Sequence, residues 1–459
     1  MRSRIQPFAE TMAAKVEPTP PLSGLPPVGG KPVIARFDGG QLSSDGGLLA
    51  LREVERRLGI ADRLAACIDD PRAPERVRHG LAAILRFRML MIAAGYEDGN
   101  DADALRRDPM FKLALDRLPS GEELCSQSTI SRLENLPDIR ALVRLGRALI
   151  DQYCASFRQV PKRIVLDIDD TFDRVHGDQQ LRLFNAYHDD YGFQPIVVFD
   201  GEGRFVTALL RPGKRPGGRE IRAFLRRLVG AIRAFWPRVE ILLRADSHYA
   251  GPQVFDWCRA NRVDWVFGLT PNAALKRHIT ALERSTAERF GAAPKRGKVR
   301  RFAQFYDAAQ SWSRVERIIA RVEAGPEGTD TRFIVTNLAG GRAKHLYQGL
   351  YCARGQAENH IKAWKNHLAA DRTCHAAAAN QFRLFLHAGA YWLLWSLRRL
   401  MPKGSTWRVM QFDTLRLRLL KLAARVVELK KQIKIHLPSS APDQAIFILL
   451  LDRLPRLVT

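Results

Sequence analysis

The spacing of apolar residues changes along the chain and predicts regions of different structure. From Leu48 to about Tyr153 apolar residues recur at helical intervals, and Arg76–Ala94 is apolar nearly all round, which predicts a central buried helix. After Pro161 the interval becomes two residues, and Arg163–Asp169 alternates between an apolar face and a face that carries acids. The pattern therefore predicts a helical region followed by a sheet whose first strand is Arg163–Asp169.

The segments after this strand predict further strands and helices in alternation. In chain order they are three strands, a helix, a strand, a helix and a strand: Leu181–Tyr187, Gln194–Phe199, Arg204–Leu210, Glu220–Ala234, Arg238–Ala245, Gly251–Asn261 and Val263–Gly268. This succession predicts an α/β sandwich, and sheets of this kind place their chemistry at the ends of the strands.

A different pattern begins at residue 271. Two alternating segments, Arg314–Val322 and Thr331–Asn337, follow a basic stretch at Pro294–Arg301 and predict a mostly β insertion. Tyr347–Ala370 and Asn380–Leu400 are again helical in pattern. The boundaries give six segments: a flexible leader rich in proline and glycine (1–35), a helical domain (36–155), the first part of an α/β core (156–270), the β-rich insertion (271–344), the second part of the core (345–402) and a C-terminal region (403–459).

The composition favours a polyanionic partner. The 459 residues include 73 Lys and Arg against 48 Asp and Glu, a formal net charge of +25, and a folded chain with such an excess of cations usually handles nucleic acid. Its six cysteines are scattered without a CxxC pair, which is typical of a reduced cytoplasmic protein and provides no zinc framework. No membrane span is expected, because the apolar run Ala445–Leu451 is far shorter than the ~20 residues that a span needs.

Four polar residues of the segment after residue 345 share one predicted helix face. At helical spacing Tyr351, Arg354, Glu358 and Lys365 fall within an arc of ~60°, and the apolar residues of the same segment fall on another face. A carboxylate between fixed cations can bind a metal ion while the cations hold phosphates. The alternative is a solvated face stabilised by a helical ion pair between Arg354 and Glu358.

Two acids at strand ends favour the chemical interpretation. Asp169 ends the first strand, in LDIDDT, and Asp246 follows the strand Arg238–Ala245, in LLRADSHY. A carboxylate on an apolar strand is costly unless it is paired or bound to a metal ion. Together with Glu358 these acids could hold two divalent cations, and Mg²⁺ or Mn²⁺ suits a set of oxygen ligands without histidine or cysteine.

The identity of the first acid leaves an alternative. Asp167 lies on the same strand face as Asp169, and either could be the metal ligand, with the other acid supporting it. Asp169 is preferred because it lies nearer the strand end. His248 could reach DNA from its place beside Asp246, but a structural role is the preferred interpretation.

The same residues resemble a known family of enzymes. The spacing Tyr351-x2-Arg354-x3-Glu358-x6-Lys365 reproduces the Y-R-E-K signature of the IS4-like superfamily of DDE transposases. Asp169-Asp170-Thr171 resembles the D-x-T motif around the first aspartate of that superfamily. Four other sequence segments are similar to those of the IS1380 branch: FDGGQLSSDGGLLALREVE, AAGYEDGNDADALRRDPMFKLAL, SQSTISRLEN and DRTCHAAAANQFRLFLHA. The likeness extends over nearly everything after residue 36.

The resemblance implies an α/β chain with an RNase H-like catalytic core, a helical N-terminal domain for DNA binding or assembly, and a mostly β insertion. It implies that Asp169, Asp246 and Glu358 are catalytic metal ligands for Mg²⁺, with Mn²⁺ as a substitute, and that Tyr351, Arg354 and Lys365 contact DNA. The implied reaction is cut-and-paste transposition: cleavage at the transposon ends and strand transfer into target DNA. The implied partners are the terminal inverted repeats, target DNA and a second copy of the chain, at the nucleoid in the cytoplasm.

Two other functions remain open from the sequence. One is an RNase H-like nuclease that cleaves DNA without strand transfer, and the other is an inactive transposase-derived DNA-binding repressor. Three segments are further candidates for DNA contact, and each also fits an ordinary solvated surface: Ser126–Asn135, Arg211–Arg227 and Pro294–Arg301.

Overall fold

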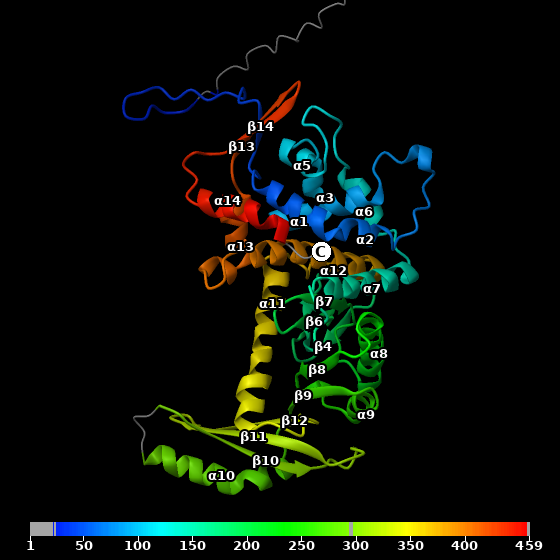
Figure 1. Cartoon of the computed structure of the whole chain (residues 1–459), viewed down its shortest axis with the longest axis vertical. Coiled ribbons are helices and arrows are strands. Elements are labelled where there is room, and N and C mark those ends of the chain that lie inside the picture. The colour runs from blue at the N-terminus through cyan, green and yellow to red at the C-terminus, as the bar shows by residue number, and fades with distance from the viewer. Residues whose placement is uncertain (1–21, 23, 293–296, 457–459) are drawn as a thin grey trace, which may run out of the picture.

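The computed structural model describes residues 22, 24–292 and 297–456. Most of the expected leader, 1–35, lies outside the described residues, and so do Lys295 and Arg296 of the basic stretch. The described chain is elongated (Figure 1). Helices from both ends of the sequence gather at one end, a sheet with its covering helices occupies the middle, and strands backed by one helix form the other end.

Eight strands form one mixed sheet. Their bounds are β2 Arg163–Asp170, β6 Ile196–Asp200, β7 Phe205–Leu209, β8 Glu240–Ala245, β9 Val263–Leu269, β10 Val299–Asp307, β11 Glu316–Gly325 and β12 Gly328–Thr336. Their order across the sheet is β10-β11-β12-β9-β8-β2-β6-β7. Strands β2, β8 and β9 run parallel, whereas β6 is antiparallel to β2 and β7 is antiparallel to β6. The result is a mixed α/β fold in which the expected first strand is central.

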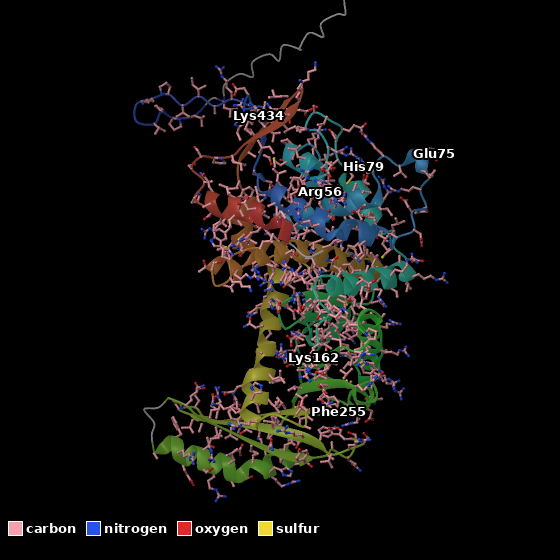
Figure 2. The ribbon with its side chains drawn as sticks, viewed as in Figure 1. Arg56, Glu75, His79, Lys162, Phe255 and Lys434 are labelled. Carbon is pink, nitrogen blue, oxygen red and sulfur yellow. The ribbon has the colours of Figure 1, made fainter. Side chains whose placement is uncertain are left out.

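Helices cover both faces of this sheet. On one face lie α8 (Gly218–Phe235) and α9 (Pro252–Ala260), where Phe255 stacks on Trp265 with ring centroids 5.3 Å apart (Figures 1 and 2). On the other face lies α11 (Gly355–Asn366), whose buried Trp364 packs against Phe205 of β7. Asp167 and Asp169 are on this second face of β2, since side chains alternate along a strand.

The insertion extends the same sheet. Strand β12 pairs with β9 from Phe333 opposite Leu269 to Thr336 opposite Val266, and β11 pairs with both β10 and β12. The helix α10 (Ala273–Gly291) packs along β10 and β11, and the alternating pattern of this region did not predict it. The insertion is therefore a helix followed by three strands, and its last strand covers the free edge of β9.

The helical end is built around α12 (Ala377–Arg399), which is buried over most of its length. It packs against α1 (Leu48–Leu58) and α3 (Leu81–Ala94) on one side and against β7 on the other. As expected, α3 is buried nearly all round, although it begins only after Gly80. The other α-helices of the described chain are α2 Ile60–Ala65, α4 Ala102–Leu105, α5 Pro109–Ala114, α6 Gln127–Glu134, α7 Ile139–Ala155, α13 Phe412–Leu415 and α14 Gln444–Arg453.

Two small sheets complete the fold. In one, β1 (Gln41–Ser43) pairs with β13 (Ala424–Leu429), which pairs with β14 (Gln432–His436), so the first and last parts of the described chain are joined. In the other, β5 (Asp190–Phe193) lies between β3 (Asp173–Arg174) and β4 (Leu183–Asn185). None of the described helices has the length and apolar character that crossing a bilayer requires.

Candidate active site

The sheet register brings the two strand-end acids together. In the parallel ladder, Ile168 of β2 lies opposite Ala245 of β8, so the next residues, Asp169 and Asp246, are neighbours at one end of the sheet. Asp246 is also the residue that precedes a short 3₁₀ turn, and its backbone is extended. Glu358 comes to the same place from α11, which packs on β2 and β6.

The guanidinium of Arg354 joins the three acids. Its Nη1 is 2.9 Å from Asp169 Oδ2, its Nη2 is 2.6 Å from Asp246 Oδ1, and Nη2 is also 3.8 Å from Glu358 Oε1. Arg354 is buried, whereas the side chains of Asp246 and Glu358 are 42% and 57% exposed. Three carboxylates predicted from separate parts of the sequence therefore surround one cation at a site that solvent reaches from one side. We call this arrangement the acid cluster.

Asp169 is the buried member of the acid cluster. The pKa of Asp169 is raised to about 7, chiefly by burial; Arg354 lowers it, and the nearby carboxylates of Asp246 and Asp170 add to the rise. A carboxyl group with so high a pKa holds its charge only with help from a neighbouring cation. Arg354, 2.9 Å from Asp169 Oδ2, is the cation that favours the ionised form of this carboxyl group.

The backbone before Glu358 is not a regular α-helix. Residues His345–Tyr351 form a π-helical turn and Cys352–Arg354 a 3₁₀ turn, and only Gly355–Asn366 is α-helical. The expectation of one continuous α-helix from Tyr347 to Ala370 is therefore wrong, and the ~60° arc calculated for it does not describe the side chains. The change of helix type directs Arg354 toward β2 and β8. Such interruptions are frequent at functional sites.

Tyr351 packs beside Arg354 at the end of the sheet. The Arg354 guanidinium carbon is 5.9 Å from the centroid of the Tyr351 ring, and burial raises the pKa of the phenol. Glycine at position 268 of β9 makes room for this ring. A Cβ atom there would lie 2.7 Å from the Tyr351 hydroxyl oxygen and 3.0 Å from the Ser247 backbone nitrogen.

Comparisons with known proteins identify the family of this chain. The model of the family described as "Transposase DDE domain group 1" matches residues 25–459, nearly the whole chain. The chain belongs to this transposase family. A comparison with curated proteins finds no match. Among the solved structures that match is one described as "Cryo-EM structure of piggyBac transposase synaptic complex with hairpin DNA (SNHP)", with 10% sequence identity, 87% of this chain and 88% of that chain covered, and a TM-score of 0.39.

DDE transposase domains generally depend on divalent metal ions, and the donor chemistry of the acid cluster fits such an ion. Asp169, Asp246 and Glu358 offer only oxygen ligands, and all three lie around the guanidinium of Arg354. In the described part of the chain, however, no three side chains of Asp, Glu, His or Cys are gathered closely enough to form a metal site by themselves. In this transposase Arg354 provides the positive charge between the acids.

Lys365 of the transposase lies outside the acid cluster. Its Nζ is 2.7 Å from Asp173 Oδ1, and it donates hydrogen bonds to the Phe172 carbonyl oxygen at 2.8 Å and to the Thr171 hydroxyl at 3.0 Å. These contacts occupy all three donors of the ammonium group. Burial raises the pKa of Asp173 to about 6, and Lys365 acts in the opposite direction. Lys365 therefore fastens the segment that follows β2.

Asp167, the alternative first acid, has a partner of its own. The Arg244 guanidinium makes two hydrogen bonds to its carboxylate, at 2.6 and 2.7 Å, and a third to the Leu350 carbonyl oxygen at 2.8 Å. Arg244 lies opposite Asp167 in the β2–β8 ladder. Both residues stand at equivalent places near the ends of their predicted strands, so the sequence was compatible with this ion pair. The register between β2 and β8 was needed to predict it.

Asp170, the residue after Asp169, is also paired. His248 Nε2 lies 2.6 Å from its Oδ1, and the amide of Gln194 donates to its Oδ2. Burial alone would raise the pKa of Asp170, but the hydrogen bonds from His248 and Gln194 hold it below its ordinary value. Sequence reasoning did not single out Gln194, which is an unremarkable polar residue at the start of a strand.

Some cations of the predicted basic segments are already paired within the chain. Arg211 is buried and makes two hydrogen bonds to Glu220, at 2.5 and 2.7 Å. Glu323 is 3.0 Å from Lys298 and 2.5 Å from Arg300, and the hydrogen bond from Lys298 is the main reason that the pKa of Glu323 falls to about 2. The basic stretch of the insertion is thus partly neutralised.

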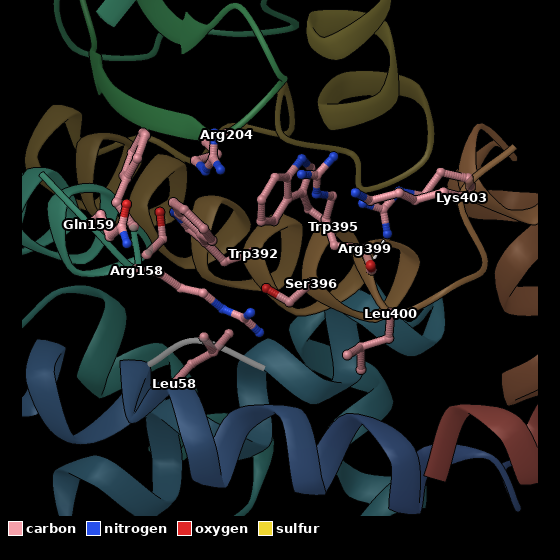
Figure 3. A pocket seen from close by; sticks show the side chains of 13 residues that line it. Leu58, Arg158, Gln159, Arg204, Trp392, Trp395, Ser396, Arg399, Leu400 and Lys403 are labelled. Atoms are coloured by element: carbon pink, nitrogen blue, oxygen red, sulfur yellow. Dashed lines mark hydrogen bonds between the residues drawn. The ribbon is translucent and has the colours of Figure 1, made fainter. Parts of the chain in front are cut away.

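A large cavity lies away from the acid cluster, between the helical end and the turn before β7 (Figure 3). Its volume is about 580 Å³, and none of the six predicted site residues lines it. Trp395 lies between the guanidinium groups of Arg204 and Arg399, each 5.3 Å from the ring centroid. These cation–π contacts hold aromatic and basic side chains together on the wall formed by α12.

Proposed function

We propose that this DDE transposase cuts DNA at transposon ends and joins the freed ends to target DNA by a cut-and-paste reaction. The observation that carries the proposal is the convergence of Asp169, Asp246 and Glu358 on Arg354, in a chain that belongs to a DDE transposase family. Asp246 and Glu358 are accessible from solvent, so a phosphodiester group of DNA can approach them.

The order of the central strands supports an RNase H-like core. In β7-β6-β2-β8-β9 the first strand in sequence, β2, is central, and only its neighbour β6 runs against it. The acid cluster lies where β2 and β8 end, which is where parallel strands place ligand-binding residues. The insertion between β9 and α11 adds strands to the far edge and leaves this end of the sheet accessible.

In the proposed reaction Asp169, Asp246 and Glu358 would hold divalent cations, Mg²⁺ by preference with Mn²⁺ as a substitute. Bound there, such ions would supply the Lewis acidity that makes a water molecule or a 3′-hydroxyl a better nucleophile and offsets negative charge on the phosphate. Arg354 keeps the acids in place and has five N–H donors, so it can also hold a phosphate oxygen.

Tyr351 and Lys365, the other residues of the Y-R-E-K pattern, position the groups around the acid cluster. Tyr351 fills the space above Gly268 and keeps Arg354 turned toward the acids. Lys365 fixes the segment of Thr171 and Asp173 directly after β2, so that Asp169 is held from both sides. The finer assignment within the transposases is the IS4-like superfamily, IS1380 branch, with a homodimer that holds two terminal inverted repeats and acts at the nucleoid in the cytoplasm.

The test uses DNA that carries the coding sequence together with its flanking sequence, incubated with full-length protein and Mg²⁺. Asp169→Asn, Asp246→Asn and Glu358→Gln are expected to reduce cleavage at least ~1000-fold, about 4 kcal/mol of barrier, while DNA binding stays within about twofold. Asp69→Asn, at an exposed acid paired with Arg144, is the matched control and should cleave at the wild-type rate.

The products separate the proposal from its alternatives. Joined products in target DNA indicate a transposase, whereas cleaved ends without joined products indicate a nuclease that lacks strand transfer. Metal-independent binding without cleavage indicates a repressor and would contradict the proposal. If Asp169→Asn cleaves normally and Asp167→Asn does not, the first ligand is Asp167.

A further inference from the structure

Aromatic side chains are exposed on the small sheet β3-β5-β4, beside the acid cluster. Tyr187 is 89% exposed, and Phe184 and Tyr191 are each nearly half exposed. His188 stacks on Phe172 with ring centroids 4.3 Å apart and an interplanar angle of 10°. Large apolar surfaces that stay in water usually serve a binding function when they occur in groups. This group comes from a segment between β2 and β6 for which the sequence predicted only a strand.

A hollow of about 330 Å³ opens next to these rings. Its lining includes Phe184, Asn185, Tyr187, Gln194, Lys214 and Arg215. Lys214 and Arg215 are exposed, and within the described chain neither of them forms an ion pair with a carboxylate. The hollow therefore combines exposed aromatic faces with two available cations.

The loop that carries these cations is held rigidly over the small sheet. Arg211 anchors its start through Glu220 and through the Lys214 carbonyl oxygen, which accepts a hydrogen bond at 2.9 Å. Glycine at 213 allows the close approach. A Cβ atom there would lie 2.5 Å from the Gly192 carbonyl oxygen and 2.7 Å from that of Leu183. The backbone that carries Lys214 and Arg215 is thus packed closely against the small sheet.

Hydrogen bonds connect the hollow to the acid cluster. Gln194 donates to Asp170, the neighbour of Asp169, and its Oε1 accepts a hydrogen bond from Asn185 at 3.1 Å. Gln194, which lines the hollow, is thus one hydrogen bond away from Asp170, the residue that follows Asp169 in β2. A ligand in the hollow would lie next to a phosphate held at the acid cluster.

We propose that this hollow binds one unpaired nucleotide of the DNA strand that is cut at the acid cluster. The base stacks on Tyr187 and Phe184, and the adjoining phosphates bind Lys214 and Arg215. Bases in a duplex already stack on each other, so exposed aromatic faces favour a nucleotide outside the helix, and cations beside them favour its backbone. The proposal rests on the proposed function, because it places the nucleotide beside the cleaved bond.

The test measures binding of full-length protein to fluorescein-labelled oligo(dT) of about twelve nucleotides and to a blunt duplex of equal length, in EDTA and in the Asp169→Asn background. Tyr187→Ala is expected to weaken oligo(dT) binding about tenfold, in the range for loss of one stacked base, and to change duplex binding less than twofold. Tyr187→Phe keeps the ring and should bind like the parent. Tyr306→Ala, at an exposed aromatic residue of β10, is the matched control and should also bind like the parent.

The roles of Lys214 and Arg215 are tested by the salt dependence of oligo(dT) binding. Lys214→Gln combined with Arg215→Gln should reduce the slope of log K against log salt concentration for oligo(dT) by ~1.4, about 0.7 for each lost phosphate contact. Equal oligo(dT) affinities for Tyr187→Ala and its parent, or an equal loss in Tyr306→Ala, would overturn the proposal. These measurements need no cleavage. If the protein binds oligo(dT) through Tyr187 but never cuts DNA, the nucleotide site stands and the proposed function is wrong. If the protein cuts DNA but Tyr187→Ala binds oligo(dT) like its parent, the proposed function stands and the nucleotide site is wrong.

Discussion

Two cations of one signature segment meet carboxylates in different ways. Arg354 lies among three acids, of which Asp246 and Glu358 are largely open to solvent. Lys365 meets Asp173, whose side chain is 2% exposed, and all three of its donors are used within the segment after β2. Both are cations of the Y-R-E-K pattern, yet one belongs to an accessible cluster and the other to a closed, buried pair.

The difference shows that the exposure of the partner decides what a cation can do. A buried pair cannot be replaced by a ligand without leaving an uncompensated charge, so it contributes to structure. A cation that also contacts solvated acids, as Arg354 contacts Asp246 and Glu358, can exchange those contacts for a metal ion or a phosphate at small cost. The sequence-based hypothesis gave Arg354 and Lys365 the same role, as phosphate contacts. The structure separates the two residues, and the following predictions test that separation.

The largest expected difference is in stability. Lys365→Met leaves the Asp173 carboxylate buried without its cation and should lower the free energy of unfolding by about 3 kcal/mol, whereas Arg354→Met should cost less because its acids are partly solvated. Urea denaturation of both variants measures the difference. The double variant Lys365→Met with Asp173→Leu should recover at least half of the loss. Wild-type stability of Lys365→Met together with slow cleavage would return Lys365 to a DNA-contacting role.

The acid cluster should also give the transposase a pH-dependent stability. Burial raises the pKa of Asp169 to about 7 from an ordinary value of 3.8, so between these values the folded chain holds a proton that the unfolded chain releases. This contribution to stability is present below the unfolded pKa and is lost as pH rises toward 7. From pH 5 to pH 7 the loss should be about 2 kcal/mol. Asp169→Asn should remove it, and the exposed control Asp69→Asn should keep it, in unfolding experiments across that range.

The role of Arg354 in catalysis should produce a smaller effect. Arg354→Lys keeps the charge but cannot bridge Asp169 and Asp246 with two separate nitrogen atoms, so single-turnover cleavage should slow about tenfold, about 1.4 kcal/mol of barrier. Its melting temperature should remain close to that of the wild type. Arg163→Lys changes an exposed arginine at the start of β2 and provides the control rate. A wild-type rate for Arg354→Lys would show that the acid cluster needs only a nearby charge.

The smallest effect is expected at the basic stretch of the insertion. Lys298 and Arg300 already pair with Glu323, so replacing both with glutamine should change the salt slope of duplex DNA binding by less than one unit. Two free phosphate contacts would change it by ~1.8. Binding titrations at several salt concentrations distinguish these outcomes. A change near the larger value would mean that DNA displaces Glu323 and that this pairing, unlike the one between Lys365 and Asp173, is exchangeable.

Local periodicity was sufficient for much of the core. The alternating run Arg163–Asp169 became β2, the buried run near Arg238–Ala245 became β8, and the apolar residues of the last signature segment became the buried face of α11. Each of these depends on which neighbours along the chain are apolar, and burial of one face fixes both the element and its orientation. Asp169 and Asp246 could be predicted because a carboxylate at the end of such a strand is conspicuous.

Contacts between distant segments could not be predicted in this way. The alternating pattern that predicted the β insertion does not show that β10–β12 join the edge of β9, nor that β1 pairs with β13. The aromatic hollow was missed for the same reason, because Tyr187 and Lys214 come from separate loops that a close backbone approach at Gly213 brings together. The helix α10 was also missed, because only the alternating segments of this region were interpreted.

The sequence by itself determined the strands and helices of the core, the three acids and the likeness to DDE transposases. Only the tertiary structure decided which charges meet: Arg354 with Asp169 and Asp246, Lys365 with Asp173, and Arg244 with Asp167. The physical reason is that an element forms from neighbours along the chain, whereas an ion pair forms from strand register and helix type. The π-helical and 3₁₀ segments before α11 are a further feature that the periodicity did not predict, because helix type there depends on packing against the sheet.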